Sequence, residues 1–196
     1  APEEARLRGL DLVQELVEWV ALAPFAYFSL KLPCQQLGDK GALFVSLLPQ
    51  LARVKELDLG GNEIGDMGLF ALAESSSLQQ LEVLDLSDNY IGPDGVRALT
   101  LAADCPSLLS LNLYINGLED EGVQILSHAP LLGQLRHLML GDNAIGDEGL
   151  FALASSPHIQ QLDTLSLIGN DFTKAGLDAL KGTVWWERVK ELELDD

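Results

Sequence analysis

Residues 54–72, VKELDLGGNEIGDMGLFAL, contain the pattern from which the whole chain is built. Apolar residues up to Leu59 precede Asn62, and a glycine, Gly68, introduces a helix-forming run. The pattern returns whenever 27 is added to each residue number, so that one column of the repeats reads Gln35, Asn62, Asn89, Asn116, Asn143 and Asn170. A fixed period of this length is typical of a solenoid, in which each repeat packs only against its neighbours.

Each repeat is predicted to hold a short strand, a turn and a helix. The two leucines of an L-x-L triplet point inward, because successive side chains of a strand alternate between its two faces. The asparagine after the strand is expected to turn inward, where its amide pairs with backbone groups that the turn leaves unpaired. The six residues of this column are therefore predicted to form a structural ladder, with an imperfect first rung because Gln35 is longer than asparagine.

The helix of each repeat is predicted to begin beside a recurrent glycine, which leaves room for the adjacent coil. This column holds Gly41, Gly68, Gly95, Gly122, Gly149 and Gly176. Aspartates ahead of it are expected to cap the helices, at Asp39, Asp66, Asp120 and Asp147.

An apolar column also closes each repeat: Leu51, Leu78, Cys105, Leu132, Ile159 and Trp186. Cys105 is therefore interpreted as a core residue that replaces leucine. Trp185 is interpreted as a shield of the last coil, or alternatively as a docking surface for a further domain.

The repeats divide the chain into three parts. Residues 1–24 do not fit the repeat, and apolar residues at helical spacing predict an N-terminal helical cap there. Residues 25–188 hold six repeats. Residues 189–196 supply only the strand of a partial seventh repeat, which either results from trimming or closes the stack.

The segment Met139–Leu162, MLGDNAIGDEGLFALASSPHIQQL, follows the sequence pattern LxxLxLxxNxIGDEGxxALA. It resembles the ribonuclease-inhibitor-like class of leucine-rich repeats, and its sequence pattern is similar to that of the bacterial members. The resemblance covers residues 25–196. It implies an α/β solenoid shaped as a curved horseshoe segment, with an inner parallel β-sheet and outer helices. It also implies a protein-binding scaffold, or a regulator of a small GTPase, since some members of the class act on GTPases.

Composition limits the classes of binding partner and the cellular compartment that are compatible with the chain. The formal net charge of −18 disfavours nucleic acid and anionic membrane surfaces and is compatible with a protein partner that carries a basic patch. Cys34 and Cys105 are separated by more than two repeats, too far along the stack to pair. Together with the lack of a visible signal peptide or membrane-spanning run, these thiols predict a cytoplasmic protein.

Catalytic, cofactor and metal signatures are weak. His128, His137 and His158 are neither spaced for a shared metal nor near a cysteine. The glycines of residues 60–65 lack the Lys-Ser/Thr of a phosphate loop, and the acidic segment 85–95 lacks the ligand spacing of a calcium loop. The sequence therefore predicts no enzyme, no cofactor and no metal site.

Outward strand positions are free of the repeat constraint, so a partner can select their identity. Large apolar side chains stand out among them at Tyr114, Met139 and Ile168. The remaining predicted partner-binding residues are Asn112, His137, Glu56, Asp58 and Asp85, with Glu191 and Glu193 on the far side. An apolar centre with a charged rim is a common interface arrangement, so protein binding through the concave sheet is the leading hypothesis.

Three alternatives stay open. The apolar residues are also compatible with ordinary surface. A GTPase regulator that contributes an arginine needs one exposed and positioned, and Arg97 and Arg136 lie outside the outward strand columns. The chain is also interpretable as a structural segment of a larger protein that self-associates through its seventh strand.

Overall fold

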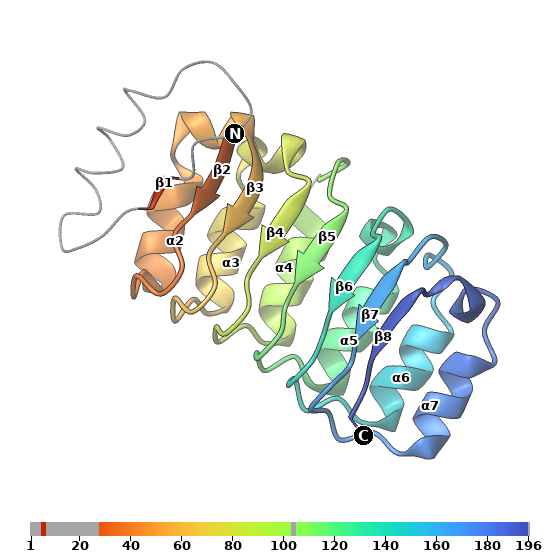
Figure 1. Ribbon diagram of the computed structural model, residues 1–196. Helices are drawn as coiled ribbons and strands as arrows, with labels where there is room; N and C mark the ends of the chain where they lie inside the picture. Colours follow the sequence, from red (N-terminus) through yellow and green to blue (C-terminus); the bar gives the residue numbers. More distant parts are fainter. Residues whose placement is uncertain (1–4, 7–27, 103–104, 196) are drawn as a thin grey trace.

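The computed structural model describes residues 5–6, 28–102 and 105–195, which form two layers (Figure 1). One layer is a parallel sheet whose strands follow the order of the sequence. Its eight described strands are β1 (Ala5–Arg6), β2 (Phe28–Lys31), β3 (Val54–Asp58), β4 (Val83–Asp85), β5 (Ser110–Asn112), β6 (His137–Met139), β7 (Thr164–Ser166) and β8 (Glu191–Glu193).

The second layer consists of helices that cover one face of this sheet (Figure 1). The α-helices in the described residues are α2 (Gly38–Ser46), α3 (Asp66–Ala73), α4 (Pro93–Ala102), α5 (Glu119–Ser127), α6 (Asp147–Ala154) and α7 (Lys174–Lys181). Short 3-10 helices lead back toward the sheet at η1 (Pro49–Arg53), η2 (Ser76–Gln80), η3 (Pro130–Gly133) and η4 (Trp186–Arg188).

The strand register repeats with the period of the sequence. Glu56 faces Val83, and Ser110 faces His137, so each pair joins equivalent positions of consecutive repeats. Neighbouring strands lie roughly 4.8 Å apart, whereas packed helices need roughly 8–10 Å. Because each repeat contributes one strand and one helix, the array curves with the sheet on its concave side. The predicted α/β solenoid with an inner parallel sheet is confirmed.

The core lies between the two layers and is continuous along the stack. The leucines of the L-x-L triplets from β3 to β7 are at most 1% exposed, as is the helix column Val45, Leu72, Leu99, Leu126, Leu153 and Leu180. Cys105 is 4% exposed among these residues, which confirms its interpretation as a core residue.

The two tryptophans of the last coil exchange burial relative to the prediction, which placed Trp186 in the core column. Trp185 is buried in the core cluster, whereas Trp186 is only half-buried and packs against that cluster. Their ring centroids lie 6.4 Å apart. The space that holds leucine, cysteine or isoleucine in this column of the other coils is too small for a full indole, because overpacking a core costs stability.

The asparagine column runs through the turns that follow the strands. Asn89 is representative: its Nδ2 donates to the carbonyl oxygens of Leu59, Leu86 and Ser87 at 2.9–3.1 Å, and its Oδ1 accepts from the N–H groups of Asn62 and Ile64. Asn62, Asn116, Asn143 and Asn170 donate in the same three directions.

Two members of the column differ from this pattern. The side chain of Gln35 donates only to the Pro33 carbonyl, at 2.8 Å, among the described residues. Asn116 was expected to be buried, but it is half-buried. The Asn62 N–H donates to Oδ1 of the asparagine in the next coil, Asn89. The Asn89 N–H does not follow this pattern, because it donates to the Ile115 carbonyl instead of the Asn116 side chain.

The aspartates cap helices, but not their own. Asp66 lies in the first turn of α3, and its Oδ1 accepts from the N–H groups of Gly92 and Gly95 at the start of α4, at 2.7 and 2.9 Å. The Asp39, Asp120 and Asp147 carboxylates likewise reach the next helix of the stack. The prediction of a cap within the same repeat was therefore wrong, because the nearest unpaired N–H groups belong to the following coil.

The N-terminal part is described only at Ala5 and Arg6. These residues form β1, paired in parallel with Leu30 and Lys31 of β2, so the predicted helix is wrong at these two positions. Pairing gives the backbone groups at this edge of β2 a partner. The rest of the predicted cap at residues 1–24 lies outside the described residues and stays a prediction.

Candidate functional site

The predicted apolar centre lies in one hollow of the concave sheet. Asn112, Tyr114, Met139 and Ile168 line it, and the hollow has a volume of about 590 Å³. They come from β5, from β6 and from the residues after β5 and β7, which lie side by side because each coil advances the chain by one strand. Glu193, predicted on the far side of this centre, also lines the hollow, and the sequence analysis missed the remaining lining residues, Ser166, Leu192 and Leu194.

Gly141 positions the two largest side chains of the hollow. A Cβ atom there would lie 2.6 Å from Cδ2 of Tyr114 and 2.8 Å from Cγ2 of Ile168. The Tyr114 ring and the Ile168 side chain therefore converge from neighbouring coils over a backbone that has no side chain. The signal for this arrangement is present in the sequence, as a glycine in an outward column between an aromatic and a β-branched residue.

The hydroxyl group of Tyr114 is fixed by an acidic neighbour. A hydrogen bond to Asp142 raises the pKa of Tyr114, and loss of hydration and the negative charges of Asp142, Asp195 and Glu193 raise it further. Tyr114 therefore stays protonated and donates to the carboxylate. The backbone N–H of Tyr114 also donates to Oδ1 of Asn112 at 3.0 Å, which fixes the start of this turn.

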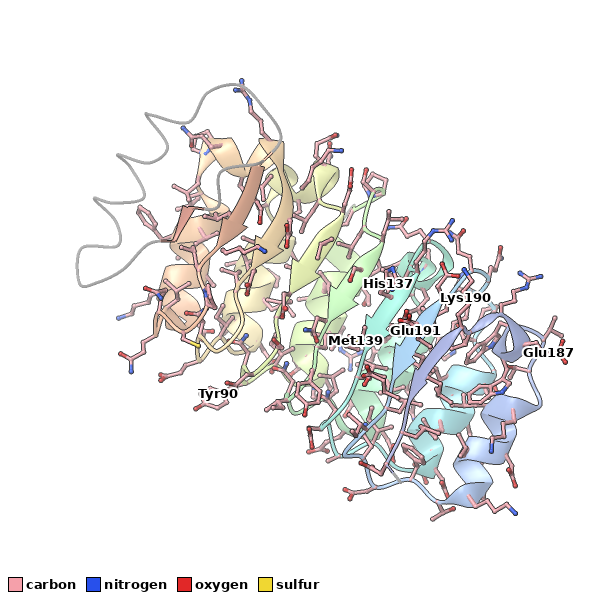
Figure 2. The ribbon with its side chains drawn as sticks, viewed as in Figure 1. Tyr90, His137, Met139, Glu187, Lys190 and Glu191 are labelled. Atoms are coloured by element: carbon pink, nitrogen blue, oxygen red, sulfur yellow. The ribbon has the colours of Figure 1, made fainter. Side chains whose placement is uncertain are left out.

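Polar residues cross the sheet beside the hollow. Nδ1 of His137 lies 3.0 Å from Oγ1 of Thr164, whose hydroxyl donates to Glu191 at 3.3 Å. His137 and Glu191 lie on the same side of the sheet as Met139 (Figure 2). This row adjoins the hollow but does not line it. Thr164 is 5% exposed, so its hydroxyl is poorly placed to attack a bound molecule.

The predicted acidic flank forms a separate patch on the first strands. Lys31 pairs with Glu56 at 3.1 Å across β2 and β3. Burial raises the pKa of Asp58, as do the charges of Asp85 and Glu56, while the Gly60 N–H and Lys31 lower it. Asn112 connects this patch to the hollow, since its Nδ2 donates to Asp85 at 3.1 Å. Glu56, Asp58 and Asp85 therefore lie beside the hollow rather than in it.

A second hollow, on the helical layer, had no counterpart in the sequence predictions. It has a volume of about 670 Å³ between α2 and α3, and its apolar lining is exposed at Leu43, Leu47, Met67 and Phe70. The sequence signal is a helix column that begins with Leu43 and Phe70 and becomes polar at Arg97 and Gln124.

The two arginines considered for a GTPase regulator are both paired with acidic residues. Arg97 pairs with Glu121 and Arg136 with Asp163, each at 3.0 Å, and both arginines lie outside the outward strand columns. In the part of the chain that the structure describes, no group of three or more histidine, cysteine or acidic side chains is placed to hold a metal ion. None of the described helices is long and apolar enough to cross a membrane.

Comparison with known proteins supports the repeat assignment. A leucine-rich repeat family model matches residues 54–73, 77–99, 104–127 and 135–154. No protein of curated function matches the sequence.

A solved structure shows the same fold. An internalin (InlF) from Listeria monocytogenes is 22% identical with a TM-score of 0.56, and the match covers 90% of this chain and 50% of the internalin chain. A plant peptide hormone receptor, RGFR1 in complex with RGF2, is 20% identical with a TM-score of 0.46, over 91% of this chain and 29% of the receptor. The chain thus spans half or less of these relatives. The repeating register, the family match and the internalin fold agree, and the chain is a leucine-rich repeat protein.

Proposed function

We propose that this protein is a non-catalytic scaffold that binds a protein partner through the concave sheet, with the hollow between β5 and β8 at the centre of the contact. Leucine-rich repeat proteins are generally protein-interaction scaffolds, and a solenoid offers a rigid, extended concave surface. The observation that carries the proposal is the convergence of Tyr114, Met139 and Ile168 in one hollow.

The chemistry of the hollow fits an interface centre. Aromatic residues and methionine are enriched in the buried centres of interfaces, and polar residues form the rim. Asn112 and Glu193, on the outermost strands of the hollow, supply polar groups beside the apolar lining. Gly141 leaves the space that the Tyr114 ring occupies, and Asp142 accepts from its hydroxyl group.

The proposal is tested with peptides selected from a random display library against the wild-type chain. Each binder is then measured in solution against Tyr114→Ala and against Phe151→Ala, a matched aromatic change at an exposed position of α6. We expect Tyr114→Ala to weaken binding about tenfold or more, as truncation of a central anchor does, while Phe151→Ala changes it less than about twofold.

Gly141→Ala provides a second variant that removes no contact atom. The added methyl group is expected to displace Tyr114 and Ile168 and weaken the same binders, because it needs the space that both side chains fill. Binders that tolerate both concave changes and are lost only with Phe151→Ala would place the binding surface on the helical layer and refute the proposal.

The GTPase-regulator alternative has no specific support in the structure. From β2 to β8 none of the outward strand positions is an arginine, and the resemblance of the repeat pattern is the reason to consider this alternative. The alternative of a self-associating segment likewise has no observation in its favour.

A further inference from the structure

The concave hollow combines an apolar lining with carboxylates that form no ion pair with a lysine or arginine of the described residues. Glu193 lines the hollow itself. Asp142 accepts from the Tyr114 hydroxyl at one end, and Asp195 accepts from the Gly169 N–H, next to Ile168, at 2.9 Å. Among the described residues, no lysine or arginine forms an ion pair with any of these three carboxylates.

The three negative charges act at one point of the hollow. All of them raise the pKa of Tyr114, so the potential at its hydroxyl end is negative. Arg136 and Lys190 of the neighbouring coils are engaged elsewhere, since both pair with Asp163. The hollow therefore has a surplus of negative charge beside an aromatic ring and an aliphatic wall.

We propose that this hollow receives a lysine or arginine side chain of the protein partner, with its carbon stem against Met139 and Ile168 and its charged head beside Glu193 and the Tyr114 ring. The inference rests on the function proposed above and specifies the chemistry of the anchor. Long basic side chains bury an apolar stem and carry the charge at the tip, which matches a hollow lined by both apolar residues and a carboxylate. A cation near a tyrosine face gains further attraction from the ring.

Other anchors match the hollow less well. A leucine or phenylalanine side chain would fill the apolar part but would remove water from Glu193 without supplying an opposite charge, which is costly. An acidic side chain would be repelled by all three carboxylates. A basic side chain alone satisfies both the apolar lining and the charge.

The test uses those selected peptides whose binding Tyr114→Ala weakens. In each, every arginine is replaced in turn by citrulline and every lysine by norleucine, which keep the stem and remove the charge. We expect one such replacement to weaken binding about five- to tenfold, since a charge-assisted contact and a cation–π contact are lost together. Glu193→Gln is expected to weaken the parent peptide to the same extent and to leave the neutral analogue unchanged.

Two controls locate the effect. Glu187→Gln makes the same change of charge on η4, away from Met139 (Figure 2), and is expected to change affinity less than about twofold. The chain has two methionines, so methyl labelling gives two signals, Met139 in the hollow and Met67 on α3 as an internal reference. The Met139 signal alone should shift when peptide is added.

The outcomes separate the two proposals. Peptides that depend on Tyr114 but tolerate loss of every positive charge, or bind equally well to Glu193→Gln, overturn the basic anchor and leave concave binding intact. A selection that yields no peptide dependent on Tyr114 overturns both. Peptides that depend on Tyr114, on one basic residue and on Glu193 support both.

Discussion

At the scale of single residues, the turn after each strand imposes a left-handed backbone conformation. The residue just before the asparagine column has a positive φ in every repeat: Cys34, Gly61, Asp88, Ile115, Asp142 and Gly169, between 51° and 71°. Glycine and aspartate tolerate this region, whereas a β-branched residue is an outlier in it. Ile115, at φ 51°, is therefore a strained position, and it directly follows Tyr114 of the hollow.

Relief of this strain should stabilise the protein. Ile115 is 40% exposed, so Ile115→Asn loses little apolar burial and should raise the free energy of unfolding by about 1 kcal/mol. Asp88→Ile, the reverse exchange at the equivalent position, should lower it by a similar amount. Urea melts at unchanged slope measure both changes. A lower midpoint for Ile115→Asn would show that the isoleucine contributes more by packing than it costs in strain.

The asparagine column gives a second test at this scale. Asn89→Ala leaves several buried backbone groups without partners, at a cost of about 1–3 kcal/mol for each unsatisfied group. Gln35→Ala removes a single side-chain hydrogen bond, to Pro33, and should cost less. The midpoints of urea unfolding decide between them. Equal losses would contradict the role of the ladder in holding neighbouring coils together.

At the scale of elements, most of the helices depend on a carboxylate from the coil before them. The exception at α5 has a visible cause: the aspartate position of the preceding coil is Pro93, which has no carboxylate. Helix α5 then begins differently, with Glu119 at φ 53° and its N–H donating to the Asn143 carbonyl at 3.0 Å. Gly38, at the start of α2, has the same arrangement with Asn62.

Loss of one such cap should destabilise the helix of the following repeat. Asp120 accepts from Gly146 and Gly149 at the start of α6, at 2.7 and 2.8 Å. Asp120→Ala should therefore lower the free energy of unfolding by about 0.5–2 kcal/mol, as for other N-caps. Asp178→Ala, an exposed change on α7, should stay within about 0.5 kcal/mol. Amide exchange should quicken in α6 rather than in α5, which contains Asp120; the opposite order would refute a cap between repeats.

At the scale of the whole molecule, the dominant feature is the negative charge of −18. A carboxylate that accepts several hydrogen bonds in the folded state is stabilised in its charged form. A carboxylate that is partly buried beside other carboxylates on the sheet is destabilised in that form. Asp147 shows the first case, because hydrogen bonds from the Thr173 hydroxyl and N–H lower its pKa below 3.8. Asp58 shows the second, because burial raises its pKa above 3.8.

These opposite shifts predict opposite effects of pH. The raised pKa of Asp58 means that the folded state holds this proton more tightly, so stability falls as pH rises from about 3.8 through the folded value. Asp58→Asn should then raise the urea midpoint at pH 7. Asp147, with a lowered pKa, contributes stability above 3.8 that is lost as pH falls through the folded value, so Asp147→Asn should lower the midpoint at pH 7. Both differences should shrink at pH 3, and shifts of the same sign at pH 7 would contradict the assignment.

The repeat, the inward leucines and the outward columns could all be predicted from the amino-acid sequence. These follow from the fixed period of the repeat and from the alternation of side chains along a strand, both of which are local properties. Tyr114, Met139 and Ile168 could be predicted to lie near one another for the same reason, because they occupy adjacent outward columns on three consecutive coils.

The coil to which each polar group donates or from which it accepts, and the columns that meet in a hollow, became visible in the folded molecule. Asp66 caps α4 rather than α3, Gly141 makes room for side chains from both neighbouring coils, and Leu192 and Glu193 of β8 complete the hollow. A repeat pattern gives the position of a residue within its own coil but not the direction of its side chain between coils. The direction of a side chain depends on the distances between coils. Those distances are set in the folded molecule, where the strands lie at hydrogen-bonding spacing and the helices lie farther apart.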